Sequence, residues 1–331
     1  MMKQLMEEIM KDALHLNATD IHLTLESSKG LVRLRKAGEM QPLKEVTIDV
    51  YRKFVNYLKF IAELDINEHK VPQSGRTAIS IEEETLNVRV STLPISLMSE
   101  VIVIRLLNAM EDRPSSTLFN TDGDYDFFLP YMARQQGLIL FTGPTGSGKS
   151  TLMYRLIQEV VSRGRQQVIS IEDPIEYQLD GMVQVEINEK ANIDYAPLLK
   201  GVLRCDPDII MFGEIRDANI ASQLLKASLS GHLVLSTFHS KSAVSTLSRL
   251  RDYGLYDEEI LQSLSLIVNQ RIIYTRKGSF IIYESLDNSQ IEILIKGGKA
   301  EHQTIVDKMG DLYEAGGLND DEYLSYMEKF K

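Results

Sequence analysis

Cysteine is nearly absent from the 331-residue sequence, which contains one, Cys205. A single cysteine excludes an internal disulfide and a zinc site built from several cysteines, so we interpret Cys205 as a small buried side chain. Long apolar runs are also missing, because no stretch approaches the roughly 20 residues that a transmembrane helix needs. Residues 1–17 are apolar at helical spacing but carry several charges, unlike the core of a signal peptide. These absences predict a protein that stays in the cytoplasm.

An excess of basic residues is absent as well. Lysine and arginine number 36 and aspartate and glutamate 47, which gives a net charge of −11 at pH 7. Proteins that bind nucleic acid usually have a basic face, so this balance argues against direct nucleic-acid binding, although a local basic groove is compatible with it. The hydrophobic fraction of 44% is ordinary for a folded protein, and the length suits two domains.

Residues 1–107 have the pattern of a small α+β domain. Helical spacing of apolar residues occurs over residues 3–16 and 47–64. Residues 108–123 are polar and contain Pro, Ser, Asn and Gly, which predicts a linker. Strands of an antiparallel sheet are expected at residues 20–26, 30–36, 77–83, 86–93 and 101–107.

Residues 124–331 have the pattern of an α/β domain, in which a parallel sheet carries helices on both faces. Residues 276–331 contain no motif that we can interpret, and we expect a helical extension that either caps this domain or binds a partner. Strands are expected at residues 137–143, 166–172, 208–214 and 232–238, and helices at residues 150–164, 195–204, 217–230 and 241–251.

Residues 143–150 match the phosphate-loop pattern G-x-x-x-x-G-K-[ST] in full, between an expected strand and an expected helix. Glycines let consecutive backbone N–H groups point at the β-phosphate, and the helix N-terminus adds partial positive charge. Lys149 is expected to reach the β- and γ-phosphates, and the Ser150 hydroxyl to ligate Mg²⁺. The predicted nucleotide-binding residues of the loop are Gly143, Pro144, Thr145, Gly146, Ser147, Gly148, Lys149, Ser150 and Thr151.

Two expected strands end in carboxylates, at the edge of the sheet where a nucleotide would lie. Glu172 and Asp173 end one strand, and Glu214 ends the other, after Gly213 at the position where many such enzymes have a magnesium-holding aspartate. Taken alone, each carboxylate could equally cap a strand or form a salt bridge. Together they predict that Glu172 and Glu214 act in catalysis and that Ser150, Glu214 and Asp173 hold the metal.

Histidines bracket a third strand, and arginines lie in the first domain. His239, at the C-terminal end of its strand, can donate a hydrogen bond to a γ-phosphate oxygen, whereas His232 precedes the strand. Arg89 and Arg105 lie in apolar strands, where an unpaired charge is costly, so each needs a carboxylate of its own domain or an anionic ligand. Arg76 is a further candidate, because an arginine from another domain or subunit can stabilise transition-state charge.

These motifs resemble those of the secretion ATPases of type II secretion, type IV pili and DNA-uptake pseudopili. GPTGSGKST resembles the Walker A motif of that family, ISIEDPIE its aspartate box, LRCDPDIIMFGEIRD its extended Walker B motif and SGHLVLSTFHS its histidine box. ATDIHL, PQSGR and RVSTLP resemble the arginine-bearing domain that precedes the motor. The resemblance covers roughly residues 18–275.

The resemblance implies a hexameric ATPase with a PAS-like N-terminal domain, a RecA-like P-loop domain, and ATP and Mg²⁺ bound between them. It implies a homo-hexamer at the cytoplasmic face of the cell membrane, held there by a platform protein of that membrane. By the match of motifs, the catalytic glutamate falls on Glu172, the Walker B glutamate on Glu214, the sensor-like histidines on His232 and His239, and the phosphate-contacting arginines on Arg76, Arg89 and Arg105.

Differences from the family's usual sequence pattern indicate which subgroup of the family the chain resembles most. The four-cysteine zinc module and the long additional N-terminal domain of pilus-extension and type II members are not found, nor is the C-terminal helical motif of retraction motors. Short, zinc-free members include the competence ATPases of Gram-positive bacteria, to which the chain is most similar. Two substitutions are Ser74, where the arginine motif usually has Asp, and Ser230, where the histidine box usually has Thr.

We therefore expect an ATP-driven motor that assembles a competence pseudopilus for DNA uptake. A pilus-retraction or type II secretion motor is the alternative within the family. A nucleic-acid translocase with the same RecA-type core is the alternative from another class, and it predicts stimulation by DNA. A regulatory protein that holds ATP but barely hydrolyses it is a further alternative.

Overall fold

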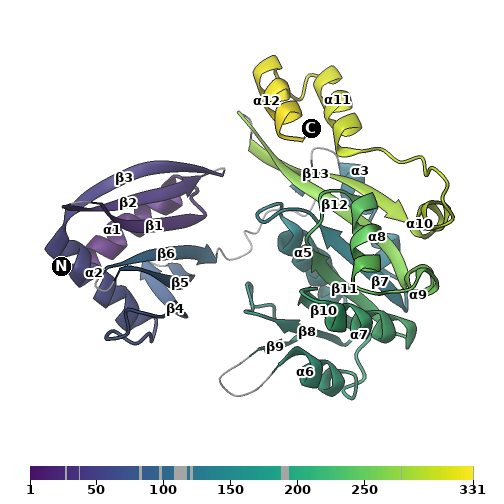
Figure 1. The fold of residues 1–331 in the computed structure, drawn as a ribbon, viewed down its shortest axis with the longest axis horizontal. Helices are drawn as coiled ribbons and strands as arrows, with labels where there is room; N and C mark the ends of the chain where they lie inside the picture. Colours follow the sequence, from purple (N-terminus) through teal and green to yellow (C-terminus); the bar gives the residue numbers. More distant parts are fainter. Residues whose placement is uncertain are drawn as a thin grey trace. The chain divides into compact units, whose positions relative to one another are not determined.

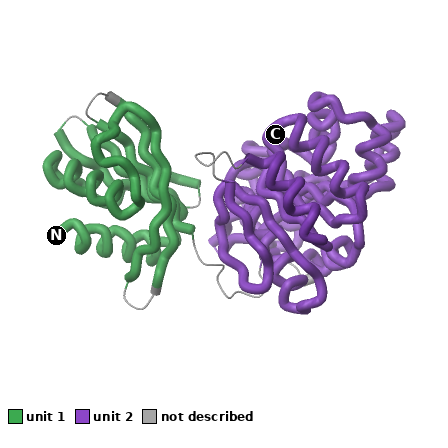
Figure 2. Tube along the Cα trace, turned by 90° about the horizontal axis from the view of Figure 1, so that it is seen from below, with its two compact units in different colours: residues 1–111 green, residues 112–331 purple. Residues whose placement is uncertain are grey.

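The computed structural model describes residues 1–26, 28–36, 38–81, 84–96, 99–107, 118–119, 122–187, 194–276 and 278–330. The chain divides into two compact units, residues 1–111 and 112–331 (Figure 2). Most of the predicted linker lies outside the described residues, but helix α3 (Asp122–Asp126) begins within it. No helix in the described ranges is long and apolar enough to cross a bilayer.

Unit 1 contains a six-stranded antiparallel sheet in the order β3-β2-β1-β6-β5-β4 (Figure 1). Helices α1 (Met2–His15) and α2 (Ile48–Ile61) supply apolar side chains to the core over one face of this sheet. Alternation fixes that face, because Val88 and Val90 are buried on either side of Arg89. The strands are β1 (Asp20–Glu26), β2 (Lys29–Lys36), β3 (Glu39–Thr47), β4 (Gln73–Ile81), β5 (Glu84–Ser96) and β6 (Ser99–Leu107).

Strand β3 is absent from the sequence-based expectation. Its residues are mostly exposed or half-buried, and it contains Pro42, which cannot donate a ladder hydrogen bond. Both features suit an edge strand, and β3 does lie at the edge of the sheet, paired with β2 alone. The alternating apolar pattern that reveals a half-buried strand is therefore missing.

Unit 2 contains a seven-stranded sheet in the order β13-β12-β7-β11-β10-β8-β9. The prediction of a parallel sheet needs one correction: β12 and β13 pair antiparallel, and the other neighbouring strands pair parallel. The strands are β7 (Gly137–Thr142), β8 (Val168–Glu172), β9 (Val183–Glu186), β10 (Ile209–Glu214), β11 (Leu233–Phe238), β12 (Leu264–Thr275) and β13 (Gly278–Asp287).

Helices pack around this sheet (Figure 1). Their apolar side chains form one large cluster with those of β7, β8, β10, β11, β12 and β13. A smaller cluster joins β12 and β13 to α11 through Ile273, Ile282, Met309 and Leu312, and partly buried side chains of α12 pack against it. Within residues 278–330, the described part of the C-terminal segment, the chain supplies one strand and three helices. The helices of unit 2 besides α3 are α4 (Leu129–Met132), α5 (Lys149–Ser162), α6 (Tyr195–Val202), α7 (Ala218–Leu229), α8 (Ala243–Asp252), α9 (Asp257–Ser263), α10 (Asn288–Ile295), α11 (Ile305–Glu314) and α12 (Asp320–Phe330).

The interpretation of Cys205 as a buried side chain is wrong. The residue is exposed in the loop after α6, and its thiol lies 3.5 Å from the Gly201 carbonyl oxygen. A polar turn follows, in which Asp206 has a positive φ of 52°. The residue type favours burial, but the position in a surface loop decides the exposure.

Candidate active site

The phosphate loop joins the fully buried strand β7 to helix α5. Gly143 and Gly148 have φ values of 139° and 82°, which side chains rarely tolerate. A Cβ on Gly143 would lie 2.6 Å from the Gln270 carbonyl oxygen of β12, so the loop can pass this strand only as glycine. Gly148 directly precedes the first residue of α5, whose unpaired N–H groups face the space where phosphates would bind.

Lys149 is buried and turned back onto its own loop. Its Nζ donates to the carbonyl oxygens of Gly143 at 3.1 Å and Pro144 at 2.9 Å. Burial lowers the pKa of the ammonium from 10.5 to about 8, against the opposing charges of Glu214 and Glu176. The Lys149 ammonium is therefore hydrogen-bonded to two neutral carbonyls. A negatively charged phosphate oxygen would bind it more strongly than they do.

We expect the affinity for ATP to fall as the pH rises above about 8. Phosphates pair with the ammonium form of Lys149, so binding to the deprotonated protein must take up a proton. The dissociation constant should then rise by up to about tenfold per pH unit. Binding of a fluorescent ATP analogue between roughly pH 7 and 9.5 measures this. Lys149→Met should lose the dependence, and an equally steep rise in that variant would contradict the assignment to Lys149.

Glu172, at the end of β8, is almost fully buried. Its carboxylate accepts hydrogen bonds from the Tyr154 hydroxyl of α5, the Ser170 hydroxyl at 2.5 Å and the Gln184 amide at 3.2 Å. Burial raises the pKa of Glu172 above its ordinary value, although the three donors oppose that rise. The donors fix the orientation of a carboxylate that burial makes more basic.

Arg216 links the other two predicted carboxylates. Its guanidinium donates to Asp173 at 2.7 Å and to Glu214, and it lies over the Tyr195 ring at 5.6 Å. Burial alone would lower the pKa of Arg216, but the hydrogen bonds to Glu214 and Asp173 raise it. The Nε2 atom of His239 lies 3.5 Å from the second Glu214 oxygen. The structure thus brings Asp173, Glu214 and His239 together at the carboxyl ends of β8, β10 and β11.

The residues present fit a magnesium ion. Asp173 and Glu214 offer half-exposed carboxylates, and Ser150 offers a hydroxyl at the start of α5. Magnesium needs only one or two protein carboxylates, since nucleotide phosphates and water complete its shell. The guanidinium of Arg216 stands at these carboxylates as a cation that the metal would displace.

The structure does not bring His232 to the loop. This residue precedes β11, and its Nδ1 lies 3.1 Å from the Ala227 carbonyl oxygen near the end of α7. Because β11 is parallel to β7, His232 lies at the amino end of the sheet, one strand length from His239. The predicted nucleotide contact of His232 has no support within this unit.

The predicted arginines form a row across three strands of unit 1. Arg76 of β4 pairs in register with Arg89 of β5, which pairs with Arg105 of β6. Arg105 donates to Asp20 at 2.9 Å, as the salt-bridge alternative requires, and Arg89 donates to Ser74 at 2.8 Å. Ser74, where the family usually has Asp, is thus a neutral acceptor. Like charges on neighbouring strands repel, so the row favours an anion.

Sequence reasoning missed two residues of this site as participants. Arg216 lies two residues after Glu214, the last residue of β10, and its position between Glu214 and Asp217 was the available signal. Tyr154 lies four residues after Ser150, which places both on one face of α5, but nothing in the sequence relates it to Glu172.

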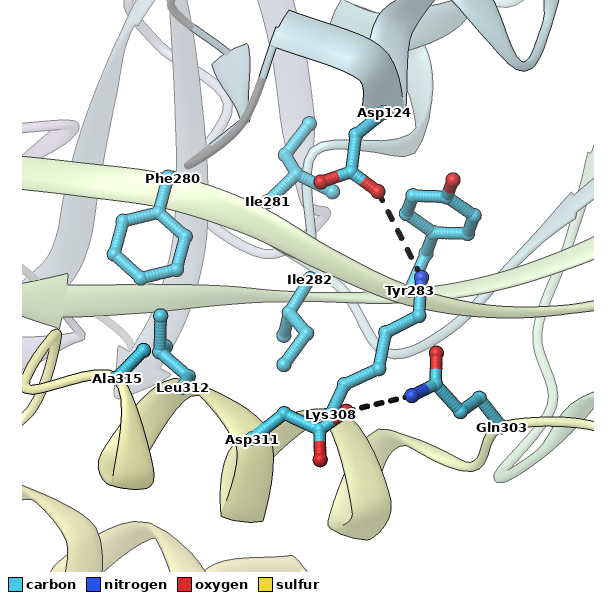
Figure 3. A pocket seen from close by; sticks show the side chains of 10 residues that line it. All are labelled: Asp124, Phe280, Ile281, Ile282, Tyr283, Gln303, Lys308, Asp311, Leu312 and Ala315. Atoms are coloured by element: carbon cyan, nitrogen blue, oxygen red, sulfur yellow. Dashed lines mark hydrogen bonds and ion pairs between the residues drawn. The ribbon is translucent and has the colours of Figure 1, made fainter.

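A cavity of about 340 Å³ lies between β13 and α11 (Figure 3). Its lining includes Phe280, Ile282 and Leu312 as apolar walls. The Lys308 ammonium lies 3.8 Å from Asp124 and 3.6 Å from the Tyr283 ring centre, and burial lowers its pKa. These contacts fasten α11 to α3 and β13.

Comparisons with known proteins agree with this architecture. A family model described as type II/IV secretion system protein matches residues 1–305. The protein transport protein HofB homolog of Haemophilus influenzae is 39% identical over 82% of this chain and 58% of its own length. The type II secretion system ATPase E of Vibrio cholerae is 38% identical over 82% of this chain and 54% of its own length, so the chain spans just over half of these relatives.

A shorter relative and two solved structures complete the comparison. The competence protein ComGA of Halalkalibacterium halodurans is 37% identical over 80% of this chain and 76% of its own length. The ATPase DotB of Legionella pneumophila has a TM-score of 0.78 at 20% identity, covering 98% of this chain and 95% of that one. The pilus retraction motor PilT with bound ADP has a TM-score of 0.70 at 24% identity, covering 96% of each chain. These likenesses confirm the predicted fold class and family resemblance.

Proposed function

Because the chain belongs to the type II/IV secretion system protein family, we propose that it is an ATP-hydrolysing motor for assembly of a competence pseudopilus in DNA uptake. The similarity to a competence protein, which extends over 76% of that relative, favours this process over type II secretion or pilus retraction. ATP and Mg²⁺ are the cofactors. The observation that carries the proposal is a phosphate loop whose lysine interacts electrostatically with Glu214 of β10 and with Glu176, shortly after β8.

The chain's own residues have distinct tasks in hydrolysis. The loop amides and Lys149 bind the phosphates, and Lys149 exchanges its two carbonyl contacts for phosphate oxygens. Magnesium, held by Ser150, Asp173 and Glu214, would neutralise phosphate charge. Glu172 accepts the proton of the attacking water, for which its raised pKa suits it. His239 donates a hydrogen bond to a γ-phosphate oxygen. It also lies beside Glu214, one of the proposed metal ligands, so it stands between the γ-phosphate and the metal site.

We further propose that the protein acts as a homo-hexamer in the cytoplasm, held at the membrane by a platform protein. The row formed by Arg76, Arg89 and Arg105 supports binding of phosphate groups by unit 1, since it concentrates positive charge on neighbouring strands. The net charge of −11 supports a motor that does not itself bind DNA.

Deleting the gene should abolish surface filaments and DNA uptake, because assembly would lack its energy source. Transformation frequency and electron microscopy of filaments measure this, and complementation with the intact gene is the control. Accumulation of filaments would identify a retraction motor instead. ATPase activity of the purified protein that rises severalfold with DNA would favour a nucleic-acid translocase.

A further inference from the structure

Three buried polar residues lie side by side across the strands next to the phosphate loop. Thr142 of β7 pairs in register with Asn269 of β12, which pairs with Glu284 of β13. Thr142 and Asn269 are fully buried, and Glu284 is 5% exposed. Asn269 donates to the Thr142 hydroxyl at 2.9 Å. Burial of three neighbouring polar side chains is costly unless each has a hydrogen-bond partner. Their partners therefore indicate which other segments of the chain these side chains anchor.

The Glu284 carboxylate joins two helix N-termini. One oxygen accepts from the Ala243 amide at 2.6 Å, and the other accepts from the Ile305 amide at 3.2 Å. These are the first residues of α8 and α11, whose amides have no partner within their helices. In the described part of the chain no lysine or arginine lies within ion-pair distance of this carboxylate. The partial positive charges of two helices, together with the nearby guanidinium of Arg271, therefore compensate a buried anion.

Two residues of this row, Asn269 and Glu284, and the neighbouring Arg271 form hydrogen bonds with the segment between His239 and α8. Asn269 donates to the Ser240 carbonyl at 3.2 Å, and Arg271, two residues along β12, donates to the Lys241 carbonyl at 2.7 Å. Glu284 fixes the end of the segment at Ala243. Three anchor points thus follow His239, at Ser240, Lys241 and Ala243, and the side chains that hold them come from β12 and β13.

We propose that Glu284 is a positioning residue, which fixes the place of His239 at the nucleotide by anchoring α8. This inference rests on the proposed part of His239 in hydrolysis. Glu284 belongs to none of the four motifs of the ATPase domain. It also contacts α11, so the carboxylate links the C-terminal helices to the segment that carries His239.

Two variants separate the two contacts of Glu284. Glu284→Gln removes the charge and turns an amide donor toward one of the helix N–H groups. Ile305→Pro removes the α11 amide together with a buried side chain of the cluster around α11, and it leaves the contact of Glu284 with Ala243 in place. Proline is well tolerated at the first helical position after the extended Thr304. The first variant therefore disturbs the anchoring of α8, and the second leaves it intact.

Glu284→Gln should lower kcat about tenfold with less than about a twofold change in KM for ATP, because the phosphate loop is untouched. Modification of His239 by diethyl pyrocarbonate, followed by mass spectrometry of the full chain, should become about threefold faster. Combined with His239→Ala, Glu284→Gln should add little further loss. Ile305→Pro should match the unmodified protein in kcat and in His239 reactivity. If Glu284→Gln does not fold, Glu284→Asp, which keeps the charge but is too short to reach both amides, supplies the same readouts.

Unchanged His239 reactivity and kcat in the folded Glu284 variant would overturn the proposal. Equal changes in Ile305→Pro would also overturn it, since they would show general loosening of the unit. If His239→Ala hydrolyses ATP normally, the proposed role of His239 fails, whereas the modification rate still tests whether Glu284 positions it.

Discussion

Replacing Lys149 by methionine should lower kcat for MgATP hydrolysis by on the order of 10³-fold or more, without lowering the melting temperature. The activity depends on a positive charge at the β- and γ-phosphates, which methionine cannot supply. The fold does not depend on that charge, because burial lowers the pKa of Lys149 to about 8 and so opposes the charged form. Methionine has a similar length and removes the cost of burying the ammonium.

Steady-state hydrolysis and thermal unfolding of the purified protein measure both effects. Lys226→Met, at an exposed position of α7, is the matched control and should retain activity. Magnesium-dependent hydrolysis that survived in Lys149→Met would show that the loop does not bind the phosphates as we propose.

Glu172→Gln should lower kcat by about 10²- to 10³-fold and leave ATP bound, because glutamine cannot accept the proton of water. In the unmodified protein, kcat should fall as the pH decreases, with a midpoint above the ordinary 4.5 of a glutamate, because burial raises the pKa of Glu172. Activity falls at low pH because protonated Glu172 can no longer accept a proton from water. Single-turnover hydrolysis and nucleotide binding across the acid range measure these effects.

Tyr154→Phe is the matched control, because it keeps the carboxylate and removes one donor to it. That donor favours the ionised form, so its loss should raise the pKa of Glu172 and move the midpoint to higher pH. A midpoint that stayed in place, together with full activity of Glu172→Gln, would assign the proton to another group.

The sequence predicted the parts of the site that are contiguous in the chain. The phosphate loop and the acidic ends of β8 and β10 were identified because strand, loop and helix patterns place Lys149, Glu172 and Glu214 at one edge of a parallel sheet. The roles of these residues stay predictions, as do those of Arg76 and Arg89. Periodicity also located both helices of unit 1 and the parallel strands around the loop.

Features that depend on distant residues could not be predicted. Asn269 lies 127 residues from Thr142, whose hydroxyl it contacts, and a polar residue in an apolar strand does not reveal such a partner. The donors of Glu172 come from α5, β8 and β9, and only packing brings them together. His232 was grouped with His239 because the two bracket one strand, yet parallel pairing places strand ends at opposite edges.

The antiparallel pairing of β12 with β13 has a consequence for shortened forms of this protein. Ending the chain near residue 276 would remove β13, which pairs with one edge of β12. The backbone groups along that edge would then be unpaired, next to β7, which leads into the phosphate loop. An exposed strand edge pairs with strands of other molecules, so truncation should cause aggregation and not yield a shorter folded unit. The last 56 residues, 276–331, are therefore part of the framework of unit 2 and not a dispensable tail.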